Sequence, residues 1–78
     1  MKVRYDASVD AAYISLVEES DREGFGHTYA CDPSGVGGQI HLDFDVSGRL
    51  TGIEVLQASK RLPASILKEG RCSSQATG

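Results

Sequence analysis

Hydrophobic and polar residues alternate along the first segment of the chain. Val3 and Tyr5 fall on one side of an extended backbone, and Lys2 and Arg4 fall on the other. This period of two is typical of a β-strand with one buried face. The Asp-Ala-Ser-Val-Asp sequence of residues 6–10 predicts a turn, because Asp and Ser side chains bond nearby backbone groups.

Two more strands are expected before the middle of the chain. Residues 11–17 alternate again and predict a strand, although a helix over residues 11–16 is the alternative because consecutive alanines suit one. Residues 18–26 are polar and interrupted by glycine, which predicts a loop. Residues 27–31 predict a short third strand, and the Asp-Pro-Ser-Gly sequence of residues 32–35 predicts the turn that ends it.

The clearest pattern belongs to residues 39–56. Ile40 and Leu42 alternate with polar neighbours, and a second alternating run covers Leu50–Leu56. Between the two runs lies a short loop that contains Ser47-Gly48. Two alternating runs joined by a short glycine-containing loop predict a β-hairpin.

After the hairpin the pattern becomes helical. Pro63 suits the first turn of a helix, where its missing N–H needs no partner. Residues 64–69 continue this helix, and Gly70 is expected to end it in a left-handed conformation. Residues 71–78 are small and polar and are expected to form a disordered tail. The residues expected to pack on the sheet are Leu62, Ile66 and Leu67.

These elements predict an α+β fold, an antiparallel β-meander of about five strands with a short C-terminal helix packed on the sheet. Residues 1–70 are expected to form a single domain. Its core is small, because the chain has 78 residues and no Trp. A folded chain of this size buries only ~60% of the surface that it exposes when unfolded. A second copy covering part of the sheet would compensate, so we expect a homo-oligomer.

Charge and cysteine content narrow the class of protein. Eight Lys and Arg against eleven Asp and Glu give a net charge of −3, which disfavours nucleic-acid binding. The basic residues at positions 60, 61 and 68 are expected on a solvated helix face. No apolar run predicts a signal peptide or a membrane span. Cys31 and Cys72 do not form a disulfide framework, so we expect a cytoplasmic protein with reduced thiols.

One motif resembles a calcium-binding loop. Asp43, Asp45, Ser47 and Glu54 fit the spacing D-x-D-x-S-G-x5-E, and their oxygens suit a hard cation. Such loops lie between two helices, whereas both flanks here have the period of a strand. We therefore predict turn-forming residues in a hairpin, with Asp43 and Glu54 exposed and opposite each other across the ladder. A metal site on these four residues is the alternative.

Other candidate chemistry has little support. His27, Cys31 and His41 offer ligands for a transition metal, but no paired spacing such as C-x2-C accompanies them, so a chance arrangement is favoured. The chain lacks a nucleophile motif such as G-x-S-x-G, so neither a catalytic residue nor a cofactor is predicted. Exposed carboxylates on an open sheet are expected to keep ordinary pKa values. The carboxylates considered are Asp6, Asp10, Asp43 and Asp45.

Two stretches resemble a widespread bacterial family of small proteins. Residues 1–16 contain Met-Lys-Val-x-Tyr-Asp followed by Asp-Ala-x-Tyr-Ile-x-Leu. Residues 42–59 read Leu-x-Phe-Asp-x-x-Gly-x-Leu-x-Gly-Ile-Glu-Val-Leu-x-Ala-Ser. Both are similar to the family catalogued as domain of unknown function 2283. The resemblance implies a compact sheet domain of prokaryotic origin with no established activity. Members of this family are sometimes found beside small toxin-like partners, which implies an antitoxin or partner-neutralising role.

Two functions remain as hypotheses. The favoured one is a non-enzymatic protein-interaction module, which forms a homo-oligomer or binds a protein encoded nearby through an exposed sheet edge or a second apolar face. Tyr13 and Val17 on the face opposite Ile14 motivate the second face. The alternative is a small metal- or ligand-binding protein or an enzyme. Its residues would be Asp43, Asp45 and Glu54, or His27 and Cys31.

Overall fold

The computed structural model of the chain describes the backbone of residues 1–77, and the side chains of these residues except for residues 19 and 72–77. The strands are β1 (Lys2–Asp6), β2 (Ala11–Ser15), β3 (Phe25–Ala30), β4 (Ile40–Asp45) and β5 (Leu50–Leu56). The helices are a 3-10 turn η1 (Glu19–Asp21), α1 (Pro33–Val36), α2 (Ala58–Arg61) and α3 (Ala64–Thr77). Within the described residues, no helix has the length and apolar character needed to span a membrane.

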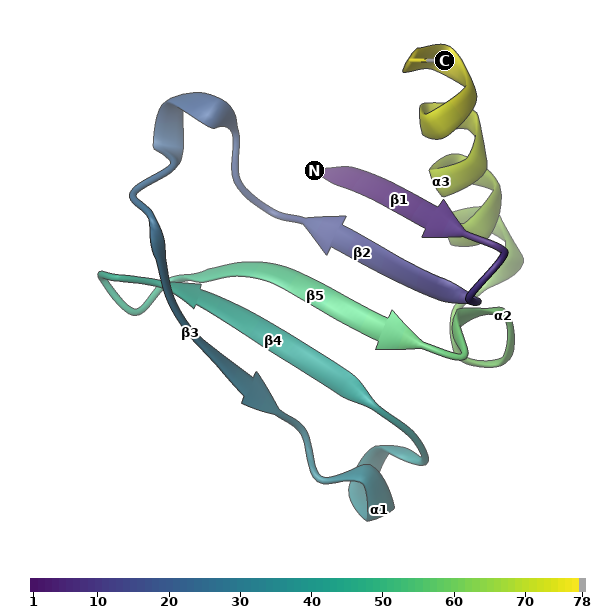
Figure 1. Cartoon of the computed structure of the whole chain (residues 1–78), viewed down its shortest axis with the longest axis horizontal. Helices are drawn as coiled ribbons and strands as arrows, with labels where there is room; N and C mark the ends of the chain where they lie inside the picture. Colours follow the sequence, from purple (N-terminus) through teal and green to yellow (C-terminus); the bar gives the residue numbers. More distant parts are fainter. Residues whose placement is uncertain (78) are drawn as a thin grey trace.

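The five strands form one antiparallel sheet in the order β1-β2-β5-β4-β3 (Figure 1). β1 and β2 form one hairpin, and β3, β4 and β5 form a three-stranded meander. The two parts meet where β2 pairs with β5. The loop after β2 therefore carries the chain across to the far edge of the sheet, where β3 begins. The predicted α+β fold, five antiparallel strands with a C-terminal helix, is confirmed.

The predicted strands are present with shifted limits. Residues 11–15 form a strand rather than the alternative helix, because they pair on both sides, with β1 and with β5. The third strand begins at Phe25 instead of at His27. A β-bulge at Gly26, between these two residues, shifts the register so that Phe25 still pairs with β4. A side chain at Gly26 would collide with the backbone carbonyl group of Asp45, so glycine lets the two strands approach.

The core lies between the sheet and the C-terminal helices. Its buried members are Tyr5, Ala12, Val55, Ala58 and Leu67. Leu62 packs against this cluster as predicted, together with two partly buried isoleucines of the sheet. Figure 1 shows α3 and α2 beside β1 and β2, and within the described residues no helix lies over β3 or β4. The helices thus cover one end of the sheet.

The predicted end of the last helix at Gly70 is wrong. α3 continues to Thr77, and Gly70 lies inside it, buried against β1. A Cβ atom at Gly70 would lie 2.9 Å from the backbone nitrogen of Tyr5, so glycine here permits close packing of helix on strand. Residues 71–78 were expected to form a disordered tail. Most of their side chains lie outside the described residues, so this expectation stays a prediction.

Helix α2 was not predicted, and it changes the role of one basic residue. The guanidinium group of Arg61 donates hydrogen bonds to the carbonyl oxygens of Val36 and Gly37. It therefore ties α2 to the end of α1 and does not lie on a solvated helix face. Lys60 and Lys68 are exposed, as expected.

Candidate functional site

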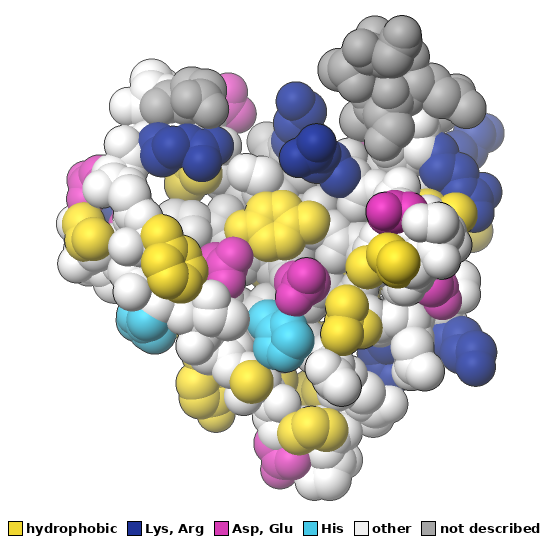
Figure 2. Space-filling model, in the orientation of Figure 1, with side chains coloured by type: hydrophobic (Ala, Val, Ile, Leu, Met, Phe, Trp, Pro, Cys, Tyr) yellow, Lys and Arg dark blue, Asp and Glu magenta, His cyan; other side chains and the backbone are white. Residues whose placement is uncertain are grey.

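The sheet has two chemically different faces. Residues directly opposite each other in the ladder share a face, and one row runs Val3–Ile14–Ile53–Leu42–Tyr29. This row belongs to the face on which α3 packs, which we call the helix face. The other side is the open face. Its two central rows are Arg4–Tyr13–Glu54–His41–Ala30 and Lys2–Ser15–Gly52–Asp43–Thr28. Figure 2 shows acidic, basic and histidine side chains around a hydrophobic side chain at its centre.

Two hydroxyl groups meet the carboxylate of Asp43 on the open face. The Tyr13 hydroxyl donates to Oδ2 at 2.8 Å, and the Thr28 hydroxyl donates to Oδ1 at 2.7 Å. The Tyr13 ring crosses Gly52 to reach Asp43, and a side chain at Gly52 would collide with its hydroxyl group. Burial of the Tyr13 hydroxyl, together with this hydrogen bond, raises the pKa of Tyr13 to about 12. The contact joins β2, β4 and β3 across the sheet.

A second polar pair lies beside this cluster. His41 on β4 and Glu54 on β5 are directly opposite, and the His41 Nδ1 atom is 2.8 Å from the Glu54 Oε1 atom. Both side chains are partly exposed to solvent. Such a cross-strand polar pair stabilises the sheet, and its exposure to solvent keeps this contribution small.

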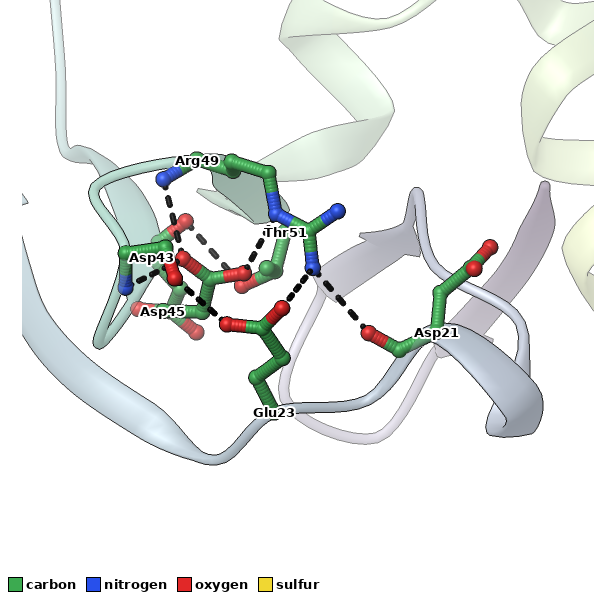
Figure 3. A network of polar contacts seen from close by, with 7 residues as sticks. Asp21, Glu23, Asp43, Asp45, Arg49 and Thr51 are labelled. Carbon is green, nitrogen blue, oxygen red and sulfur yellow. Dashed lines mark hydrogen bonds and ion pairs between the residues drawn. The ribbon is translucent and has the colours of Figure 1, made fainter.

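Asp45 organises the hairpin turn between β4 and β5. Its carboxylate accepts hydrogen bonds from the backbone N–H groups of Ser47 and Arg49 and from the Arg49 Nε atom, each at 2.9 Å. The Asp45 side chain is only 3% exposed. The Arg49 backbone donor is the main reason that the pKa of Asp45 lies below its usual range. Figure 3 shows Arg49 reaching further, to Glu23 and to the backbone oxygen of Asp21.

The residues of the calcium-loop alternative do not point to a common centre. Asp43 lies opposite Gly52 and not opposite Glu54, so the expected pairing of the two carboxylates is wrong. The hydroxyl of Ser47 donates to Glu23, which leaves each member of the motif with a different partner. Across the part of the chain that the structure describes, no three His, Cys, Asp or Glu side chains form a group able to hold a metal ion. The predicted turn-forming role of Asp45 is confirmed.

The histidines and Cys31 are likewise kept apart. His27 stacks on Phe44 with ring centroids 4.9 Å apart, and both residues share the helix face with Leu42. His41 belongs to the open face, so the two histidines point to opposite sides of the sheet. Cys31 follows β3 and is a free thiol.

Asp10 has a structural role that the sequence did not suggest. Its carboxylate accepts a hydrogen bond from the Tyr5 hydroxyl at 2.7 Å and from the Ser59 backbone and hydroxyl at 2.9 and 2.7 Å. The Asp10 backbone oxygen also accepts from the N–H of Ala58. Asp10 therefore caps α2, because the helix's own Gln57 supplies no side-chain cap.

The expectation of an ordinary pKa is wrong for the carboxyl groups of Asp6, Asp10 and Asp45. Hydrogen bonds lower the pKa of Asp6, where the Ser8 hydroxyl is the main donor, and the pKa of Asp10, where the Tyr5 hydroxyl is. Asp45 behaves in the same way. Solvent exposure alone would leave these pKa values ordinary, but hydrogen-bond donors from nearby residues stabilise the charged form of each carboxylate.

A cleft of about 550 Å³ lies on the open face beneath the loop that precedes β3. Lys2 and Arg4 line one side of it, and neither has an ion-pair partner among the described residues. The acidic groups of the cleft are engaged, since Glu18 lies 3.7 Å from the N-terminal amino group and Glu23 lies 3.4 Å from Arg49. The cleft thus leaves cationic groups available to solvent.

Most of the chain matches a known protein family. A family model described as a protein of unknown function, DUF2283, matches residues 2–59. The chain belongs to the DUF2283 family. The matched segment contains all five strands and ends at Ser59, the residue that Asp10 holds at the start of α2. No curated protein and no solved structure matches the chain.

The β3 edge of this DUF2283 sheet differs from the rest of the molecule. β3 pairs only with β4, and all six of its residues are exposed. Its sequence, Phe-Gly-His-Thr-Tyr-Ala, contains no Lys, Arg, Asp, Glu or Pro. Phe25 and Tyr29 are 68% and 58% exposed. Neither the alternation pattern nor the charge of this segment had distinguished it from an ordinary strand.

Proposed function

We propose that this domain is a non-enzymatic protein-interaction module that binds protein through the β3 side of its sheet. The observation that carries the proposal is the exposed, uncharged edge strand Phe25–Ala30. An edge strand presents unpaired N–H and C=O groups that a second strand can bind. Soluble proteins usually protect such edges with charged residues or Pro. β3 has neither, and its bulge at Gly26 affects only one end.

The apolar surface beside this edge supports the same proposal. α3 packs against β1 and leaves the opposite half of the helix face without a helix. Leu42 and Ile53 are half-buried there, and Tyr29 at the end of their row is exposed. Apolar surface next to an open sheet edge is typical of a contact site between proteins. The partner is a second copy of the chain or a protein encoded nearby. The domain would neutralise the latter by binding it, as an antitoxin does.

Binding to the product of the neighbouring gene tests this function. We expect the purified pair to associate, and we expect Tyr29→Lys to weaken the association more than tenfold by placing a charge at the edge. Val9→Lys is the control, because it adds the same charge at an exposed apolar position in the turn between β1 and β2, away from β3. The proposal fails if the domain neither self-associates nor binds this protein, or if Tyr29→Lys binds as well as wild type.

The open-face cleft favours a second candidate, the binding of a small ligand beside Lys2 and Arg4. A ligand that binds only the native state raises the melting temperature. Thermal unfolding with calcium, magnesium, zinc, manganese and inorganic phosphate therefore provides the test. A rise with phosphate that Lys2→Gln and Arg4→Gln abolish would support ligand binding, and no rise with any of the five would contradict this candidate.

A further inference from the structure

The hydrogen-bond pattern of β3 identifies which backbone groups face outward. The N–H of Cys31 donates to the carbonyl oxygen of Ile40 at 2.9 Å. Because bonded and non-bonded pairs alternate along an antiparallel ladder, the pair Tyr29–Leu42 also turns its groups inward. Thr28 and Ala30 therefore direct their N–H and C=O groups away from the sheet. The pairing of β4 with β5 is consistent with this assignment. The N–H of Leu56 donates to the carbonyl oxygen of Gln39, so the odd-numbered residues of β4 direct their backbone groups toward β5 and the even-numbered residues direct theirs toward β3.

Features at both ends limit this outward edge. The bulge between Phe25 and His27 interrupts the regular ladder, so Gly26 cannot extend it. Beyond Cys31 the chain turns away, because Asp32 caps α1 and accepts a hydrogen bond from the N–H of Ser34. The regular outward groups are consequently those of Thr28 and Ala30.

We propose that β3 pairs antiparallel with β3 of a second copy, with Tyr29 on the two-fold axis. The inference rests on the proposed interaction function and names its partner and register. In this register Thr28 lies opposite Ala30 of the second copy, and each such pair exchanges both of its backbone hydrogen bonds. Tyr29 lies opposite Tyr29 of the second copy in a non-bonded pair, where side chains come closest. A register centred on Thr28 would require outward groups at Gly26, which the bulge removes.

A second copy fits this edge for two reasons. The strand carries no formal charge at neutral pH, so it meets its own copy without like-charge repulsion, although the whole chain has a net charge of −3. The pairing also brings two exposed aromatic rings together on the helix face, and cross-strand aromatic pairs are favourable. The row that ends at Tyr29 then continues into the same row of the second copy.

The assembly closes as a dimer. A two-fold contact uses the same surface on both copies and leaves only the two β1 strands as edges of the joined sheet. α3 packs against β1, and this strand exposes Lys2 and Arg4. Charges and a covering helix are the devices that prevent further strand addition.

Cysteine cross-linking tests the register in the full chain with Cys31 and Cys72 replaced by Ser. We expect Tyr29→Cys to form a disulfide-linked dimer on mild oxidation, because opposite non-bonded residues have Cα atoms about 4.5 Å apart, within the range of a disulfide. Thr28→Cys is the control, since its counterpart lies diagonally across the axis, out of reach. Cross-linking at position 28 instead of position 29 would overturn the register.

Sedimentation equilibrium tests the self-pairing itself. We expect a wild-type dimer, at least a tenfold higher dimer dissociation constant for Tyr29→Lys, and an unchanged one for Val9→Lys, with circular dichroism confirming that all three fold. A wild-type monomer at the highest concentration overturns the self-pairing. If that monomer binds the neighbouring gene's product and Tyr29→Lys does not, the interaction function stands with another partner. If neither association occurs, both proposals fail.

Discussion

Replacing Gly70 with Ala separates two opposite expectations. If Gly70 lay free within the helix, Ala would be neutral in packing and would stabilise the helix interior by about 1 kcal/mol. In the structure, the added Cβ would lie 2.9 Å from the Cβ and backbone nitrogen of Tyr5, and 3.2 Å from the carbonyl carbon of Arg4. The strand backbone cannot rotate aside as a flexible side chain would, so α3 must shift away from β1.

Overpacking of a well-packed contact typically costs ~1–3 kcal/mol, to which the displaced buried contacts of the helix add. The cost exceeds the gain in helix propensity, so we expect Gly70→Ala to destabilise the domain by about 1 kcal/mol. For a domain of this size that corresponds to a drop of roughly 4–8 °C in melting temperature. Urea unfolding monitored by circular dichroism measures the change. The exposed α3 position Ser65→Ala is the control, with an expected small gain in stability. A Gly70→Ala variant more stable than wild type would refute the packing of α3 on β1.

Two further predictions concern the open face and the hairpin turn. In Gly52→Ala the new side chain displaces the Tyr13 hydroxyl from Asp43. We therefore expect the pKa of Tyr13, measured by NMR titration, to fall from about 12 toward about 10. An unchanged pKa would contradict this role of Gly52. For Asp45, whose pKa is lowered in the folded state, the stabilisation is present above the unfolded pKa of about 4 and is lost as pH falls through the folded value. Urea midpoints should therefore fall below pH 4 more steeply in wild type than in Asp45→Asn, and equal slopes would contradict the assignment.

Local patterns predicted the parts of the fold that local chemistry determines. The hairpin of β4 and β5 was predictable because its alternation and its Asp-x-Ser-Gly turn lie within 20 residues of one another. The pairing of β2 with β5 rather than with β3 was not predictable, because it depends on which apolar rows fit together across the sheet. Gly70 was misassigned for a related reason: a glycine after an apolar run looks the same whether it ends a helix or allows close packing.

The candidate site shows the same division. The turn role of Asp45 followed from its spacing to Ser47 and Gly48. The capping of α2 by Asp10 joins residues 49 positions apart, and no local signal reports it. The outward groups of β3 depend on its pairing partner, which the sequence alone did not supply. The weak alternation of this segment therefore predicted a strand here, but it did not predict that the strand has an open, uncharged edge.

Amide hydrogen exchange in the wild-type protein tests the central claim, that the β3 edge binds a second copy. The N–H of Tyr29 points toward Leu42 in β4, so it should be protected at every protein concentration. We expect the N–H groups of Thr28 and Ala30 to be protected at high protein concentration and to lose this protection on dilution. Rapid exchange at both residues at all concentrations, with Tyr29 still protected, would contradict it.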